Sequence, residues 1–172
     1  MVGSGKFLFI FTLDKFKSLM TTFIGEYSCK VDAKGRIVLP SAFKKQMATE
    51  AQDKFVVKKD IFENCLVLFP MDEWQRQVEL IRKKLNPYNR EHNKFQRNFF
   101  LGMAELSLDN INRLLVPSRL IQLVDIKQDV ILLGQDEKIE IWSSEVYGKI
   151  GMEQDDFASL AEKLMGGNLN VD

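Results

Sequence analysis

The chain of 172 residues carries 24 Lys and Arg against 24 Asp and Glu, and 45% of its residues are apolar. This length and composition allow one sizeable folded unit or two very small ones, and they exclude a wholly disordered chain. The zero net charge makes the whole chain a poor general binder of polyanions, and no apolar run reaches the roughly 20 residues of a membrane-spanning helix.

Residues 1–22 differ from the rest of the chain and are predicted to form a leader outside the fold. Lys6 followed by "FLFIF" is typical of a secretion signal, but the apolar stretch is short and no A-x-A cleavage site follows it. We therefore interpret Met20 as the working start and expect the protein to remain in the cytoplasm.

The next segment is predicted to form two strands joined by a tight turn. "EYSCKV" and "RIVLP" have strand-forming sequences, and "DAKG" at residues 32–35 lies between them. Gly35 adopts the positive φ that such turns commonly require at little cost. Pro40 ends the second strand, and Ser41 is expected to be the N-cap of a short helix.

Two further strands, "KFVVKK" and "NCLVLFP", precede a helix that is expected to begin after Asp72 as its N-cap. Asn86-Pro87 ends this helix, and "NREHNKFQRNFF" is a basic connector with a predicted helix of its own. The spacing of the apolar residues in the first helix predicts a stripe that serves the core or an interface. The stripe consists of Trp74, Val78, Ile81 and Leu85.

The pattern then repeats. Residues 31–47 and 108–124 align without a gap, with four identities and six exchanges between apolar residues, which indicates an internal duplication. "KIEIWS" at 138–143 corresponds to "CLVLFP" at 65–70, and a last helix is expected around 157–164. One repeat has too few apolar residues to fold comfortably alone, so the two are expected to exchange strands and close one shared barrel.

The charge is divided unequally between the repeats. Residues 23–99 hold 15 Lys and Arg against 10 Asp and Glu, whereas residues 100–172 hold 6 against 13. A basic first half is compatible with a polyanionic partner, although an accidental split remains the alternative.

Enzyme chemistry finds little support in the sequence. The single histidine, His92, lies in the charged connector, and Ser41 and Ser118 are explained as helix caps. No nucleophile elbow, P-loop or dinucleotide motif is present, and Cys29 and Cys65 fit no metal-ligand spacing. We predict that the chain is not an enzyme and has no cofactor or metal.

The turn "KVDAKGR" is the candidate binding element because it gathers Lys30, Lys34 and Arg36 around Asp32. A narrow hairpin tip fits a DNA major groove, where arginine pairs with guanine O6 and N7 and lysine neutralises phosphate. Asp32 is expected to hold Arg36 or to shape the turn through backbone N–H groups. The alternative is an ordinary solvated hairpin.

"FIGEYSCKVDAKGRIVLPSAFKKQM" resembles the MraZ family of bacterial transcriptional regulators. The resemblance rests on the F-x-G-E-Y opening at 23–27, the D-x-x-x-R turns at 32–36 and 109–113, and "IEIW" at 139–142, and it covers residues 23–150. It implies an α+β, β-rich fold in which two repeats form one AbrB-like swapped-hairpin β-barrel with short flanking helices. The repeats would be residues 23–99, including the connector, and 100–172, including the last helix.

The resemblance also implies a ring-shaped homo-oligomer that binds double-stranded DNA at the nucleoid. The target would be short G-rich direct repeats upstream of the division and cell-wall gene cluster that contains its own gene. Asp32, Arg36, Asp109 and Arg113 match the DNA-contacting motif. Successive subunits of a ring present the same turn in the same sense, which suits direct repeats. The alternative is a ring-forming protein-interaction module with vestigial DNA contact.

The second turn lacks two features of the first, because Lys34 corresponds to Ile111 and Gly35 to Asn112. Asn tolerates a left-handed backbone, so the turn shape should survive, but the phosphate-binding charge is lost. We expect the first turn to read DNA and the second to serve barrel closure or a subunit contact. The alternative is that both turns contact DNA equally.

A homo-oligomer is expected on physical grounds too. The Trp74 stripe and the Leu160/Leu164 face offer more apolar surface than one small barrel needs.

Overall fold

The computed structural model describes residues 21–47 and 53–166, so residues 1–20 of the expected leader lie outside the described part. The first repeat contains β1 (Phe23–Lys30), β2 (Arg36–Val38), α2 (Ser41–Gln46), β3 (Lys54–Lys59), β4 (Leu66–Pro70) and α3 (Met71–Lys84). The connector is α4 (Arg90–Phe100). The second repeat contains β5 (Ala104–Ser107), β6 (Arg113–Leu115), α5 (Ser118–Leu123), β7 (Asp129–Asp136), β8 (Lys138–Ser143), α6 (Ser144–Tyr147) and α7 (Gln154–Met165). The fold is thus α+β.

Strands of the two repeats are interleaved in a six-stranded antiparallel sheet of order β1-β7-β8-β4-β3-β5. β1 of the first repeat pairs along its whole length with β7 of the second, from Phe23↔Asp136 to Lys30↔Asp129. β5 of the second repeat pairs with β3 of the first. Each repeat therefore contributes its first strand to the other repeat.

The expected closed barrel is not found among the described residues, because β1 and β5 form the two edges of the large sheet. The short strands β2 and β6 pair with each other in a separate ribbon, which we call the β2–β6 ribbon. An isolated bridge between Val31 and Ile37 links this ribbon to the end of β1. Strands of three residues, each followed closely by a proline, offer too few backbone groups to join both sheets into one cylinder.

A single main core lies between the large sheet, the β2–β6 ribbon and the short helices α2 and α5. Ile37 and Leu114 point inward from the ribbon and are 2% exposed. Phe43 of α2 packs edge-on against Phe23 of β1. Because both repeats and both sheets contribute to this core, the repeats form one packed body.

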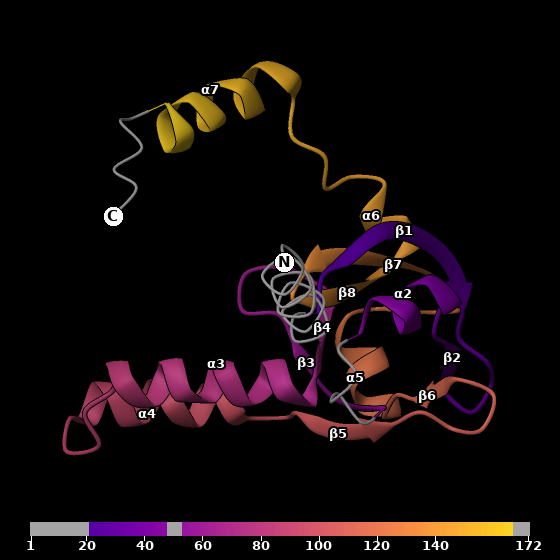
Figure 1. Ribbon diagram of the computed structural model, residues 1–172, viewed down its shortest axis with the longest axis horizontal. Helices are drawn as coiled ribbons and strands as arrows, with labels where there is room; N and C mark the ends of the chain where they lie inside the picture. Colours follow the sequence, from indigo (N-terminus) through magenta and orange to yellow (C-terminus); the bar gives the residue numbers. More distant parts are fainter. Residues whose placement is uncertain (1–20, 48–52, 167–172) are drawn as a thin grey trace, which may run out of the picture.

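On the opposite face of the large sheet, α3 packs against β3 and β4, and α3 and α4 lie side by side as a hairpin (Figure 1). Trp74 of α3 packs on Phe69 and stacks on Phe99 of α4, with ring centroids 5.8 Å apart. Of the two roles expected for the stripe, core or interface, Trp74 has the first, and its buried surface is therefore not available for the expected subunit contact. This cover explains why β3 and β4 are apolar on both faces.

Lys58 of β3 is buried beneath this helix hairpin at 5% exposure. Its Nζ lies 3.4 Å from the centroid of the Phe99 ring, in a cation–π contact. Desolvation by burial lowers the pKa of Lys58 to about 8, and the charge of Asp60 opposes this shift.

The expected N-caps are wrong. α2, α5 and α3 each begin directly after a proline, and no side-chain cap hydrogen bond is found. Ser41 and Ser118 are the first helical residues, and Asp72 lies in the first turn, where the helix dipole favours a carboxylate. In each of these helices a proline is the N-cap residue, and the predicted cap lies one or two positions after it, within the helix.

The α3–α4 hairpin and α7 project from the sheets (Figure 1). The α3–α4 hairpin extends from one end of the long axis, whereas the β2–β6 ribbon lies at the other end. α7 stands apart from the sheets and follows an irregular segment after α6. Among the described residues, no helix combines the length and apolarity that crossing a membrane requires.

Candidate nucleic-acid interface

The turn between β1 and β2 is organised by the carboxylate of Asp32. Its Oδ1 accepts hydrogen bonds from the backbone N–H groups of Lys34 and Arg36, both at 2.9 Å. Its Oδ2 accepts a hydrogen bond from Nε of Arg36 at 2.6 Å. Asp32 therefore has both roles considered from the sequence, because it shapes the turn and also holds the arginine side chain.

The turn between β5 and β6 has the same hydrogen bonds. Oδ1 of Asp109 accepts from the backbone N–H groups of Ile111 and Arg113 at 3.0 and 2.9 Å, and Oδ2 accepts from Nε of Arg113 at 2.7 Å. Asn112 adopts a φ of 60°, comparable to the 85° of Gly35. The prediction that the second turn keeps its shape is confirmed.

The electrostatics of the two turns also match. The backbone hydrogen bond from Arg36, followed by that from its side chain, lowers the pKa of Asp32 below its ordinary value. Arg113 lowers the pKa of Asp109 in the same way. Both carboxylates are therefore ionised at neutral pH and keep their arginines paired.

Each turn also binds the backbone just beyond the end of the opposite ribbon strand. The N–H of Val116 donates to the carbonyl of Gly35 at 2.9 Å, and the N–H of Leu39 donates to the carbonyl of Asn112 at 2.8 Å. A Cβ at position 35 would lie 2.7 Å from the carbonyl oxygen of Val116. Gly35 is thus required by this close approach as well as by its positive φ, and sequence reasoning found only the second requirement.

The register of the β2–β6 ribbon places both arginines on one surface. Arg36 lies opposite Leu115, and Val38 lies opposite Arg113. Because strand residues alternate between faces, these four residues share the face turned away from the core. The side chains of Arg36 and Arg113 are 30% and 26% exposed, and Val38 and Leu115 are 54% and 57% exposed. We call this surface the ribbon face.

The two apolar residues of the ribbon face were missed in the sequence analysis. A period-two pattern in "RIVLP" and "RLLVP" separates Ile37 and Leu114 from Val38 and Leu115, and could have identified them. Assigning the arginines to the same face, in contrast, required the register between two strands from different repeats.

The lysines differ in their distance from the turns. Lys34 is exposed within the first turn. Lys30 is the last residue of β1 and lies 3.8 Å from Asp129, so it flanks the turn. The second turn receives a lysine that sequence reasoning missed, since Nζ of Lys44 in α2 donates to Oδ1 of Asn112 at 2.9 Å. A lysine of the first repeat therefore lies at the second turn, with its charge paired to Asp53 at 3.2 Å.

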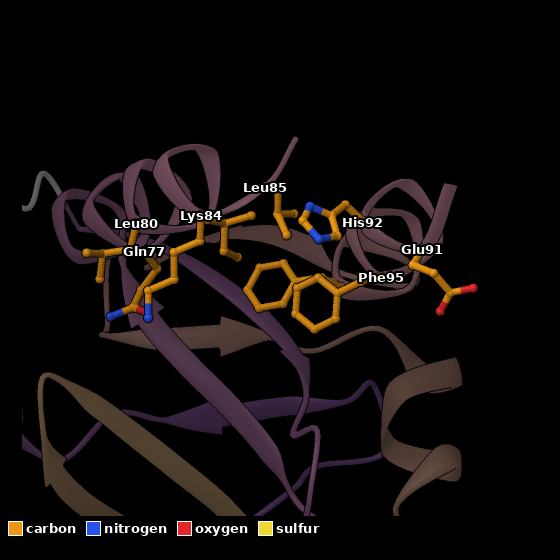
Figure 2. A pocket seen from close by; sticks show the side chains of 9 residues that line it. Gln77, Leu80, Lys84, Leu85, Glu91, His92 and Phe95 are labelled. Atoms are coloured by element: carbon orange, nitrogen blue, oxygen red, sulfur yellow. The ribbon is translucent and has the colours of Figure 1, made fainter. Parts of the chain in front are cut away.

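His92 has a structural contact, because its Nδ1 accepts the backbone N–H of Asn86 at 2.9 Å at the start of the α3–α4 connection. Figure 2 shows His92 at an apolar groove between α3 and α4, which has a volume of about 610 Å³. No cluster of three or more metal-ligating side chains occurs in residues 21–47 and 53–166. The groove lies in the helix hairpin, remote from the ribbon face.

Comparison with known proteins agrees with the two-repeat arrangement. A family model described as "MraZ protein, putative antitoxin-like" matches residues 22–98 and again residues 99–166. A "Transcriptional regulator MraZ" from Phocaeicola vulgatus is 39% identical over 150 residues, covering 87% of this chain and 97% of the relative. Proteins of the same name from Christiangramia forsetii and Flavobacterium psychrophilum are 41% and 40% identical. They align with 87% and 89% of this chain, and with 96% and 97% of their own lengths.

Proposed function

Because the chain belongs to the MraZ family, and its relatives are named transcriptional regulators, we propose that it regulates transcription by binding DNA through the ribbon face. One observation carries this proposal, namely the presence of Arg36 and Arg113 on a single exposed face of a two-stranded ribbon. A two-stranded ribbon fits the major groove of B-DNA.

Pairing with aspartate orders the two arginine side chains in advance, which favours their binding to bases. Each guanidinium is bound through Nε by an aspartate of its own turn, which restricts its conformations before DNA arrives. A side chain that is already ordered loses less conformational entropy on binding. Arginine donors that pair with O6 and N7 select guanine, which is why we propose a G-rich target.

The two turns are proposed to contribute unequally. Lys34 is exposed beside Arg36 and can neutralise a phosphate, whereas Ile111 occupies the corresponding place beside Arg113. Lys44 is near the second turn, but its ammonium group already binds Asn112 and lies 3.2 Å from Asp53. We expect the first turn to dominate and the second to add a weaker contact.

The target is proposed to be short G-rich direct repeats upstream of the protein's own operon in the division and cell-wall cluster. A homo-oligomer would place several ribbon faces on successive repeats, and binding several weak sites at once raises affinity without new contacts. Such a regulator acts at the nucleoid, within the cytoplasm.

A protein-interaction function is the second candidate. The exposed side chains of Val38 and Leu115 lie beside the arginines and could bind an apolar partner surface. They are equally suited to contact thymine methyl groups, so the DNA experiment distinguishes the two candidates.

The test is an anisotropy titration of the upstream DNA with purified variants. We expect Arg36→Ala to reduce affinity at least tenfold and Arg113→Ala to reduce it less, since a good arginine–guanine pair contributes about 1–3 kcal/mol of discrimination. Arg36→Lys should retain only salt-sensitive, non-specific binding. Lys83→Ala removes the same charge at the far end of α3 and should leave affinity unchanged.

Circular dichroism must accompany these titrations because Arg36 and Arg113 also hold their turns. If both alanine variants fold and bind the operator with unchanged affinity, the ribbon face does not read DNA. If they lose affinity equally, with unchanged oligomer mass, the two turns contribute equally.

A further inference from the structure

One side of α4 carries three cations in a row. Arg90, Lys94 and Arg97 recur at intervals of four and three residues, the spacing of one helix face, and all three are exposed. Together with Tyr88 and Asn93 they line a hollow of about 570 Å³, which we call the α4 basic hollow. It shares no lining residue with the apolar groove between α3 and α4.

The charge of the α4 basic hollow is not neutralised within the described part of the chain. Other cations are paired, as Arg36 is with Asp32 and Arg76 with Glu73. In residues 21–47 and 53–166, none of the three cations of the hollow forms an ion pair. Glu91 is the only acid of α4, and it lines the apolar groove instead. The hollow therefore presents a net positive charge.

The remaining wall of the hollow is ordered and polar. Nδ2 of Asn93 donates to the backbone carbonyls of Pro87 and Asn89, which ties α4 to the turn that precedes it. The backbone N–H of Tyr88 donates to Oδ1 of Asn86 at 3.0 Å, and Tyr88 itself is 97% exposed. Arginine, lysine, asparagine and tyrosine are all side chains that proteins use to bind phosphate oxygens in nucleic acids.

The length of the row indicates what kind of anion fits it. The stretch from Arg90 to Arg97 spans about 10 Å at 1.5 Å per residue. Duplex DNA carries one negative charge per roughly 1.7 Å of its axis, hence about six over the same length. A linear polyanion can therefore meet all three cations at once, whereas one small anion cannot.

We propose that the α4 basic hollow binds the phosphate backbone of duplex DNA. Phosphate contacts carry no sequence information, so this surface adds affinity for any duplex and does not select the site. It is separate from the ribbon face, because the α3–α4 hairpin and the β2–β6 ribbon lie at opposite ends of the molecule (Figure 1). The inference thus goes beyond the proposed function, and only the choice of DNA as the polyanion rests on that function.

The acidic side of α7 in a second copy is the competing occupant. Asp155, Ser159 and Glu162 have the same four-and-three spacing as the cations of the hollow. This side of α7 offers two carboxylates to three cations, with a serine at the middle position. The duplex offers a charge to every cation and therefore fits the row better.

The first test is the salt dependence of binding to a duplex of unrelated sequence, measured by anisotropy at several KCl concentrations. The slope of log K against log[salt] is about −0.9 per neutralised phosphate, so Lys94→Ala/Arg97→Ala should make it shallower by about 1.8. Both residues are exposed, and thermal melts should confirm that the variant is folded.

Lys83→Ala/Lys149→Ala is the matched control. It removes the same two charges from exposed positions that do not line the hollow, and should keep the wild-type slope. An unchanged slope in Lys94→Ala/Arg97→Ala overturns the proposal. An equal loss of slope in the control also overturns it, because the effect would then come from net charge alone.

The second test excludes the competing occupant by sedimentation velocity without DNA. Lys94→Ala/Arg97→Ala should keep the mass of the wild-type protein, since the hollow is proposed to bind DNA. A smaller mass would show that the hollow binds another copy of the chain, and would overturn the proposal.

Failure of this contact can be separated from failure of the proposed function. Arg36→Ala should lose the preference for G-rich DNA over the unrelated duplex, whereas Lys94→Ala/Arg97→Ala should retain that preference. Loss of preference thus tests the ribbon face, and the salt slope on unrelated DNA tests the α4 basic hollow.

Discussion

Gly35 and Asn112 occupy equivalent positions in the two turns, but their surroundings differ. Both have a left-handed backbone, which asparagine tolerates better than most residues. At position 35, however, an added Cβ would meet the carbonyl oxygen of Val116 at 2.7 Å. A backbone atom cannot move aside as a flexible side chain can, so only the first turn requires glycine for space.

We therefore predict that Gly35→Ala lowers the free energy of unfolding by about 1–3 kcal/mol, the usual cost of a strained backbone position. Asn112→Gly is the matched control. It removes the hydrogen bond from Lys44 but relieves the left-handed backbone, so it should change stability by less than about 1 kcal/mol. Urea denaturation measures both, and a Gly35→Ala variant as stable as the wild type contradicts the argument.

For individual residues, the sequence predicted the contacts that lie within one turn. Asp32 and Arg36 are four residues apart, and their pairing follows from local turn chemistry. The contacts of Gly35 with Val116 and of Asn112 with Lys44 join different repeats. They depend on the register of β2 against β6, which no local pattern determines.

At the scale of the elements, β3 illustrates a limit of sequence analysis, which predicted the strand but not the helix that covers it. "KFVVKK" was predicted as a strand and is β3, but Lys58 within it is buried rather than solvated. The predicted connector helix is α4, and it lies over this face of the sheet with Phe99 against Lys58. Periodicity predicts that a helix forms, whereas the sheet face that it covers depends on the path of the whole chain.

The buried lysine should make stability depend on alkaline pH. The pKa of Lys58 is about 8 in the folded protein and 10.5 in its ordinary state, so between these values the unfolded chain binds more protons. Stability contributed by this group therefore rises with pH over that range, by up to about 1.4 kcal/mol per pH unit. Lys58→Met should lack this contribution.

The measurement is denaturation of both proteins from pH 7 to 10. The stability of Lys58→Met relative to the wild type is expected to fall as pH rises, because only the wild type gains from losing the buried proton. Comparing the two proteins cancels the titration of the other lysines. A constant difference across this range means that Lys58 keeps its charge when buried.

On the scale of the whole molecule, the repeats are interdependent. β1 depends on β7 for its pairing, and β3 depends on β5 along its outer edge. The main core also draws on both repeats. The sequence predicted this exchange from the small apolar content of one repeat, but it did not predict the open sheet.

We predict that residues 23–99 produced alone will not unfold cooperatively, because β1 and one edge of β3 would have no partner strands. Mixing them with residues 100–172 should restore a cooperative transition and the near-ultraviolet signal of Trp74 and Trp142. Thermal melts of each half and of the mixture make the comparison. Cooperative unfolding of residues 23–99 alone, at the stability of the full chain, would show that the first repeat is self-sufficient.

The two turns lie at opposite ends of the β2–β6 ribbon because its strands are antiparallel. With identical turns, the ribbon would look the same after a half rotation, and symmetric readers of that kind match palindromic DNA. Because Lys34 lies at one end and Ile111 at the other, the two ends of the ribbon differ in charge and the symmetry is broken. Two identical single-repeat chains could never acquire this difference, whereas a fused pair can change one end alone. With DNA binding by the ribbon face as proposed above, fusion would therefore allow the protein to distinguish the two orientations of a site along the duplex.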